Sequence, residues 1–452
     1  MHKPMWQILA RMLQWTISVF LFAESCGVFA ESVPIPNPAW VYTVSASHRD
    51  LFESECVRAI ARLRTLLLDH DGVANSSERD VLRAYLAHRD VDWPSFLIGI
   101  ADAHDFPWQA IYNHTYWMLR EKLDLRRTWA LLSTGEPPPA TNVLPSGNVP
   151  NSTFFTNTDI TSYTPDYLAS EVEYIRPRGK ITKTRPKKGG TAEGFFGCDE
   201  RGIEYIFVFD PPFNPEMNTS AEFIGSTLFR ILGYRVPKTA ICTIHGTGDP
   251  RLDGRRAVAT IAVQNVRGGW KYRTFKHRRE IRAVRLFAAW IHNVDQTDQN
   301  TGLSETMPGV YAYYIWDFGA SLGSFTFRPK MARLGWTYLW KPEEALLSPL
   351  RRAALLPRPW ACDEMQYSPA VGCFSDNFDP DRWVPFYPNF AFNEATEADL
   401  RWAAARLAQL SEEQVRTVVR LAQFSYPQDA DYVLQVLLAR RAKLLHRYLH
   451  WP

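Results

Sequence analysis

The sequence lacks several features that would assign a function directly. Its formal net charge is only +3 over 452 residues, too small to indicate a nucleic acid or an anionic surface as partner. The basic run KYRTFKHRRE, residues 271–280, is therefore expected to be a solvated helix start and not a nucleic-acid interface. No C-x-x-C pair occurs among the six cysteines, which argues against a structural zinc site. His245, His277 and His292 show neither H-x-x-x-H nor H-E-x-x-H spacing, so they do not indicate a histidine metal site.

The first thirty residues carry a pattern of their own. Lys3 and Arg11 precede the mostly apolar stretch MLQWTISVFLFAESCGVFA, which ends at Ala30. A basic start, a short apolar stretch and a small final residue are typical of a secretory signal peptide. The stretch is interrupted by Glu24, whereas a membrane span needs about 20 apolar residues. We expect residues 1–30 to be a signal peptide and the protein to be exported (periplasmic or secreted); the alternative is that an uncleaved N-terminus anchors it in the membrane.

Cysteine usage agrees with export only in part. Removal of the signal peptide leaves an odd number of cysteines, which cannot all pair: Cys56, Cys198, Cys242, Cys362 and Cys373. Cys362 and Cys373 flank a short polar stretch and are the best candidates for a disulfide in an oxidising compartment.

Composition divides the remaining chain into regions. Residues 31–134 are expected to form a helical N-terminal domain, because apolar residues such as Phe52, Cys56 and Ile60 recur at helical spacing. Residues 135–170 are rich in Pro, Ser, Thr and Asn, the composition of a linker. Residues 171–452 are expected to form one bilobal unit, with strands and one helix in 171–265 and mostly helices in 266–452. The predicted fold class is therefore α+β.

Individual elements of the bilobal unit can also be predicted. The stretch EYIRPRGKITKT (173–184), a Gly-rich segment and GIEYIFVFD (202–210) indicate a hairpin with a glycine-rich tip followed by another strand. Apolar spacing predicts helices over 218–233 and 276–293, and RAVATIAVQNV (256–266) is predicted to be a strand between them. Ser411 followed by Gln414 indicates a capping box, and the chain is expected to end in helices.

Two polar stretches carry the candidate chemistry. WIHNVDQTDQNTGL (290–303) contains Asp295 and Asn300 in the spacing D-x-x-x-x-N, and YYIWDFGASLG (313–323) contains Asp317 in D-F-G. In phosphoryl transfer from ATP, one Asp orients the attacking hydroxyl, while an Asn and a second Asp hold magnesium, which prefers oxygen ligands. The order and spacing match those of protein kinases. Asp298 is a competing candidate for the catalytic acid or base, although only Asp295 has the spacing to Asn300.

A structural interpretation of the same residues is open as well. Asn, Asp and Gly form turns by bonding their own backbone, so Asp295 and Asn300 can be loop formers. An acid at Asp317, directly after an apolar strand, is harder to explain in this way, because burying it without a cation or hydrogen bonds is costly.

The stretches quoted above, with NTSAEFIGSTLFRILGYRVP (218–237) and the C-terminal PNFAFNEATEADLRWAAARLAQLSEEQVRTVV (388–419), resemble an uncharacterised bacterial exported family with a protein-kinase-like core. That family is distantly similar to HipA-like and spore-coat-type secreted kinases. The resemblance covers about residues 175–450. It implies a bilobal kinase-like fold with ATP and Mg²⁺ as cofactors and a hydroxyl-bearing protein or small molecule as substrate.

The resemblance also implies roles for individual residues. Asp295 would be catalytic, Asn300 and Asp317 would hold magnesium, and the phosphate loop would contain Gly189, Gly190 and Gly194. Glu222 would pair with a strand lysine, but Val208 stands where that lysine is expected. Lys187 or Lys188, on the Gly-rich turn, could substitute for it. Two functions therefore remain open: an exported atypical kinase, or a catalytically inactive kinase-like binding or scaffold module of the cell envelope.

Overall fold

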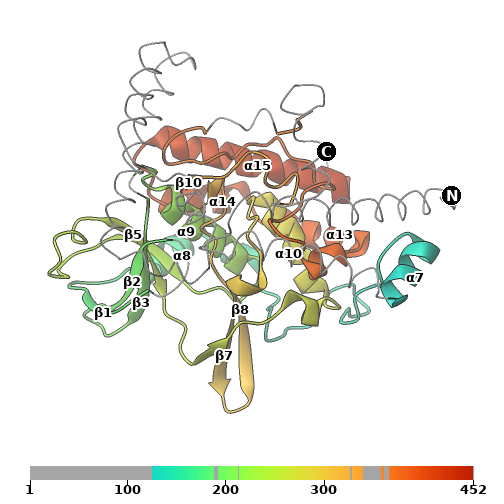
Figure 1. Cartoon of the computed structure of the whole chain (residues 1–452), viewed down its shortest axis with the longest axis horizontal. Coiled ribbons are helices and arrows are strands. Elements are labelled where there is room, and N and C mark those ends of the chain that lie inside the picture. The colour runs from blue at the N-terminus through green and yellow to red at the C-terminus, as the bar shows by residue number, and fades with distance from the viewer. Residues whose placement is uncertain are drawn as a thin grey trace, which may run out of the picture. The chain divides into compact units, whose positions relative to one another are not determined.

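The chain folds into a mixture of antiparallel sheets and helices, as the α and β patterns predicted (Figure 1). The computed structural model describes residues 125–187, 192–211, 213–325, 328–338, 358–360 and 366–450. With Arg358 excepted, these belong to one compact unit, Pro107–Leu339 with Pro359–Pro452. The predicted signal peptide, residues 31–124, Gly189, Gly190 and Cys362 lie outside the described residues. Within them, no helix has the length and apolar character needed to cross a membrane.

The largest sheet contains five antiparallel strands in the order β1-β2-β3-β5-β4. The bounds are β1 (Thr182–Pro186), β2 (Gly194–Cys198), β3 (Glu204–Phe209), β4 (Thr239–Thr243) and β5 (Arg256–Ile261). Along β3, Tyr205, Phe207 and Phe209 are buried and alternate with half-buried residues, which gives the sheet one core face. The N–H of Ile181 donates to the carbonyl of His245 at 3.1 Å, so the segments before β1 and after β4 also meet.

Two helices contact this sheet. Helix α9 (Met217–Ile231), predicted from apolar spacing, packs against β3, β4 and β5. Helix α8 (Pro165–Ile175) contacts β4 and begins at the N-cap Thr164, whose hydroxyl accepts the N–H of Tyr167. Residues 173–175, expected to begin a strand, are instead the last turn of α8. Here the buried spacing of Leu168, Val172 and Ile175 is helical, and the strand β1 begins only at Thr182.

The remaining helices form the second part of the unit (Figure 1). They are α10 (Arg279–Trp290), α12 (Phe390–Asn393), α13 (Glu397–Ala408), α14 (Glu412–Leu421) and α15 (Pro427–Leu449). The predicted capping box is confirmed at the start of α14: the N–H of Gln414 donates to Ser411 Oγ at 3.1 Å, and the N–H of Ser411 donates to Gln414 Oε1 at 2.8 Å. The guanidinium of Arg440 on α15 donates to the last carbonyls of α10 and joins these two helices.

A second sheet projects from the unit as the long β7–β8 hairpin (Figure 1). It contains β6 (Val266–Gly268), β7 (Thr301–Met307) and β8 (Val310–Ile315). Because Thr301 pairs with Ile315, the residues just before β7 and just after β8 lie at the same end of the hairpin. The short strands β9 (Ser324–Phe325) and β10 (Arg328–Pro329) follow and pair with each other.

The segment 135–164, part of the region with linker composition, contributes to the core of the unit. Phe154 and Phe155 are buried, and Phe155 contacts Trp402 of α13 at 5.5 Å between ring centroids. Asn142 donates to the carboxylate of Glu280 on α10 at 2.6 Å. Of the predicted helical N-terminal domain, the structure describes α7 (Leu125–Thr134).

Candidate functional site

Asp295 lies in a loop that is folded on itself between α10 and β7. Its N–H donates to Asn293 Oδ1 at 3.1 Å, and the side-chain amide of Asn300 donates to the carbonyl of Asp295 at 2.7 Å. Asn300 ends the short 3₁₀ helix Asp298–Asn300 and is 9 % exposed. The first and last residues of the D-x-x-x-x-N stretch are therefore joined by a direct hydrogen bond, which closes the loop.

Asp298, the competing acid, is used to anchor a neighbouring segment. Its carboxylate accepts the N–H of Tyr272 at 2.8 Å, while the Tyr272 hydroxyl donates to Gln296 Oε1 at 2.9 Å. Tyr272 therefore holds the loop from two sides. These contacts favour Asp295 over Asp298 as the acid that faces a substrate.

Asp317 lies two residues after the end of β8 and is exposed. Its φ of 62° lies in the left-handed region, a conformation that costs energy for residues other than glycine and that is found at functional sites. The next residue, Phe318, is fully buried and packs against α9, where a Cβ on Gly225 would lie only 2.8 Å from Phe318 Cβ. The buried Phe318 therefore fixes the turn that presents Asp317.

Glu222 of α9 holds the same turn through its backbone. Its carboxylate accepts the N–H of Phe318 and also bonds the N–H of Gly319. Burial, followed by the charge of Asp317, raises the pKa of Glu222 to about 8, while the two amides and Lys187 oppose this shift. The helix carboxylate thus has partners although Val208 cannot supply one.

Lys187, at the end of β1, supplies the cation that the sequence lacks on β3. Burial lowers the pKa of the Lys187 ammonium, and the charges of Asp317 and Glu222 oppose this shift, so the ammonium lies within electrostatic range of both acids, while its Nζ donates to the carbonyl of Ala192 at 3.1 Å. Gly194 pairs with Val208 at the start of β2. A Cβ there would lie 2.3 Å from the carbonyl oxygen of Phe207 and 3.1 Å from Lys187 Cδ, so this glycine leaves room for β3 and for the lysine stem.

The acids of the site repel one another. Burial, followed by the charge of Asp317, raises the pKa of Asp295 to about 7, whereas the Asn300 hydrogen bond and Lys330 act in the opposite direction. Like charges that repel each other are stabilised by a cation between them. The predicted site residues that the structure describes are therefore brought together, with Lys187 added and Gly194 placed beneath it.

The donor set suits magnesium delivered with a nucleotide. Asn300 uses its amide nitrogen on the carbonyl of Asp295, which leaves its side-chain oxygen as a possible ligand, and its backbone carbonyl accepts the N–H of Trp316, the residue before Asp317, at 3.2 Å. Among the residues that the structure describes, no group of three or more His, Cys, Asp or Glu side chains is suited to holding a metal. Mg²⁺ does not need such a group, because it is commonly bound by one or two protein oxygens together with substrate phosphates and water.

We expect the stability of the ligand-free protein to fall as the pH rises, and Asp295→Asn to reduce that fall. The folded-state pKa of Asp295, about 7, lies above the value of about 3.9 for an unfolded Asp. Folding therefore favours the protonated acid, and its contribution is complete below about pH 4 and lost as the pH rises through about 7. Urea unfolding of both proteins at several pH values measures this. If the free energy of unfolding changed equally with pH in wild type and Asp295→Asn, the raised pKa of Asp295 would be contradicted.

The turn after Asp317 also contains the sequence Gly-Ala-Ser-Leu-Gly (319–323), which matches the G-x-S-x-G nucleophile motif of hydrolases. Ser321 is fully buried, and its hydroxyl has no hydrogen-bond partner among the described residues. A serine nucleophile needs an adjacent base and access to substrate. The geometry therefore does not support a hydrolase.

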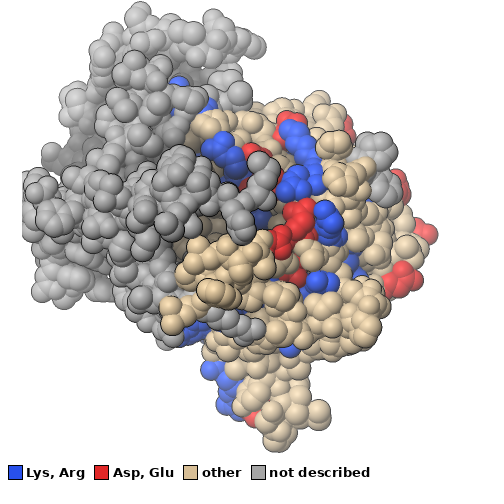
Figure 2. Space-filling view, turned by 90° about the vertical axis from the view of Figure 1, so that its right-hand side faces the viewer, with Lys and Arg blue, Asp and Glu red and all other residues tan. Residues whose placement is uncertain are grey.

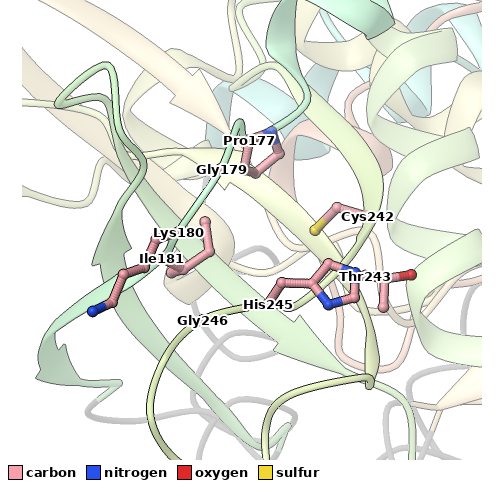
Figure 3. A pocket seen from close by; sticks show the side chains of 8 residues that line it. All are labelled: Pro177, Gly179, Lys180, Ile181, Cys242, Thr243, His245 and Gly246. Atoms are coloured by element: carbon pink, nitrogen blue, oxygen red, sulfur yellow. The ribbon is translucent and has the colours of Figure 1, made fainter.

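A pocket of about 380 Å³ lies elsewhere, where the segments before β1 and after β4 meet (Figure 3). Lys180, Ile181, Cys242 and His245 contribute to its lining, and none of the predicted site residues does. On the molecular face shown in Figure 2, basic and acidic side chains lie next to each other. Among the described residues visible on that face, the two signs of charge are therefore mixed.

Comparison with known proteins adds distant similarities. No protein-family model and no curated protein matches the chain. Among solved structures, the proinflammatory kinase CtkA of Helicobacter pylori has 12% identity and a TM-score of 0.37, covering 61% of this chain and 98% of its own. HipA of Shewanella oneidensis MR-1, solved with HipB and operator DNA, has 10% identity and a TM-score of 0.31, covering 64% and 71%. The MAP kinase LmaMPK10 of Leishmania major has 10% identity and a TM-score of 0.21, covering 62% and 99%. The TM-scores are too low for these likenesses to support a conclusion about activity.

Proposed function

We propose that the protein is an exported, atypical kinase-like phosphotransferase that uses Mg²⁺ and ATP to phosphorylate a hydroxyl of a protein or small molecule. The observation that carries this proposal is the convergence of Lys187, Glu222, Asp295 and Asp317, which act on one another electrostatically although they come from separate segments. The five-stranded sheet with α9 would be the N-lobe and the helices from α10 onward the C-lobe.

Each residue has a role that its contacts support. Asp295 would orient the acceptor hydroxyl and take its proton, for which a pKa near neutrality is suited. Asn300 and Asp317 would hold the magnesium, which neutralises charge on the phosphates when it is bound. Lys187 would bind phosphate oxygens in place of a strand lysine. Glu222 would keep the Phe318–Gly319 turn, and so Asp317, in place.

The substitution at Val208 favours a second candidate, an inactive kinase-like module that binds or scaffolds in the cell envelope. Loss of the strand lysine is the specific observation behind it. Lys187 weakens this alternative, because its ammonium lies within electrostatic reach of both Glu222 and Asp317. Export remains an expectation from residues 1–30, and it would require a source of ATP outside the cytoplasm.

The test is thermal unfolding with and without ATP, ADP or GTP and Mg²⁺ or Mn²⁺. Ligand at about 100 times its Kd should raise the free energy of unfolding by about 2.7 kcal/mol. Asp295→Asn should keep that stabilisation and lose transfer of the γ-phosphoryl group, because its side chain contacts the acceptor and not the nucleotide. A wild-type protein whose melting temperature no nucleotide changes would end the proposal.

A further inference from the structure

Lys330 is a buried lysine whose amino group contacts two segments of the site, the loop that contains Asp295 and the turn that follows Asp317. It follows β10 directly and is 2 % exposed. Its Nζ donates to the backbone carbonyl of His292, in the loop that presents Asp295, and to the carbonyl of Ala320 at 2.9 Å, in the turn that presents Asp317. One ammonium group therefore joins two loops that come from different parts of the sequence.

These two hydrogen bonds do not by themselves require a charge. A neutral donor could satisfy both carbonyls, and burying an ammonium group is costly unless it is compensated. Among the described residues, no carboxylate forms an ion pair with Lys330. Burial lowers the pKa of Lys330 well below its ordinary value and the charge of Arg440 acts in the same direction, whereas Cys373 and Asp295 raise it. Of these groups Asp295 is the one with a carboxylate, and it offsets the cost of burial only in part.

The backbone of Lys330 is also fixed. Its N–H donates to the carbonyl of Gly323 at 2.8 Å, next to the pairing of β9 with β10. Gly323 itself permits this close packing, since a Cβ there would lie 2.5 Å from the backbone of Cys373. Lys330 is therefore fixed both at its backbone N–H and at its side-chain amino group.

We propose that Lys330 is a positioning residue that, through its hydrogen bonds to the carbonyls of His292 and Ala320, keeps the Asp295 loop and the Asp317 turn at one working separation. The role of Lys330 in positioning metal ligands rests on the proposed phosphoryl transfer. The hydrogen-bonded link between the two loops does not depend on that proposal. The connection predicts that the two loops loosen together when the ammonium group is removed.

The first measurement is amide hydrogen exchange in Lys330→Met, which keeps the length of the stem and removes the charge and the donors. The matched control is Lys443→Met, because Lys443 is exposed and, among the described residues, its ammonium group bonds Asp376, far from both loops in the sequence. We expect exchange at the N–H groups of Asp295 and Phe318 to accelerate by about tenfold or more, as loss of hydrogen bonds to a charged group implies, with no change in α13. Acceleration in only one loop, or in neither, would overturn the connection.

The second measurement separates positioning from general stability. ADP affinity is compared with and without Mg²⁺ in wild type, Lys330→Met and Lys443→Met. We expect Lys330→Met to keep metal-free affinity and to lose most of the gain that Mg²⁺ gives, because the separation of Asn300 and Asp317 is no longer fixed. An equal loss in both conditions would show a structural role and overturn the proposal.

Two other outcomes are also decisive. If wild type binds no nucleotide, the proposed phosphoryl transfer and with it the positioning role fail, while the exchange data still decide whether Lys330 joins the loops. If Lys330→Met does not fold, Lys330→Gln, which retains an N–H donor without the charge, takes its place. Failure of both variants to fold, with Lys443→Met folded, would make Lys330 a residue of the fold and overturn the positioning role.

Discussion

Asp317→Asn should abolish Mg²⁺-dependent nucleotide binding and leave the ligand-free protein at least as stable as wild type. Asparagine is the matched substitution, because Asn tolerates the left-handed φ of 62° that Ala would adopt only with strain. The substitution replaces the proposed carboxylate ligand with a neutral, weaker oxygen ligand and also relieves repulsion of Asp295 and Glu222. Melting temperatures of both proteins, each with and without Mg²⁺ and ADP, measure the effect.

The size of this effect separates a metal site from a polar turn. At saturating ligand, about 100 times the wild-type Kd, the mutant should lose the whole stabilisation of about 2.7 kcal/mol. If Asp317 served only to form the turn, the mutant would be less stable by roughly 1–3 kcal/mol in every condition. A wild type indifferent to ligand together with a destabilised mutant would therefore contradict the catalytic interpretation.

Lys187→Met should lower the rate of phosphoryl transfer by about 10²–10³-fold, the range found when one preorganised electrostatic contact to the transition state is removed. The reason is that Lys187 is the cation within electrostatic reach of both Glu222 and Asp317 on the β1 side of the site. ADP release from Mg-ATP, with and without added acceptor proteins, measures the rate.

Lys180→Met is the matched control for this substitution. Lys180 lies a few residues earlier in the same chain segment, but its side chain lines the pocket of Figure 3 and not the acidic site. It should keep the wild-type rate. An equal loss of transfer rate in both variants would indicate a general effect of basic residues. An unchanged rate in Lys187→Met would show that a group other than Lys187 takes the place of the strand lysine.

Much of the fold follows from local patterns in the sequence. The helices α9 and α10 have apolar residues at helical spacing, and the burial along β3 alternates as its sequence does. The capping box at Ser411 follows from side chains only three residues apart. Residues 173–175 show the limit of this reasoning. Their apolar and polar residues suit a strand or a helix end, and it is the N-cap Thr164, nine residues upstream, that decides for the helix.

The site was predictable where its geometry is local. Asp295 and Asn300 are joined by a loop a few residues long, and Asp317 reaches them because β7 and β8 form a hairpin. The contacts of Glu222 were not predictable, since they go to backbone N–H groups, which every residue carries. Lys330 had no sequence signal either. Its partners are two carbonyls that lie 38 and 10 residues away in the chain.

The β7–β8 hairpin has a consequence for how this protein could be altered. Its base, where Thr301 pairs with Ile315, sets the separation of Asn300 and Asp317, whereas its tip at Met307 and Val310 is exposed. Lengthening or shortening the tip in matched pairs of residues would preserve the strand register at the base. The hairpin can therefore accept an inserted epitope or fluorophore at its tip without any change in the spacing of Asn300 and Asp317 at its base.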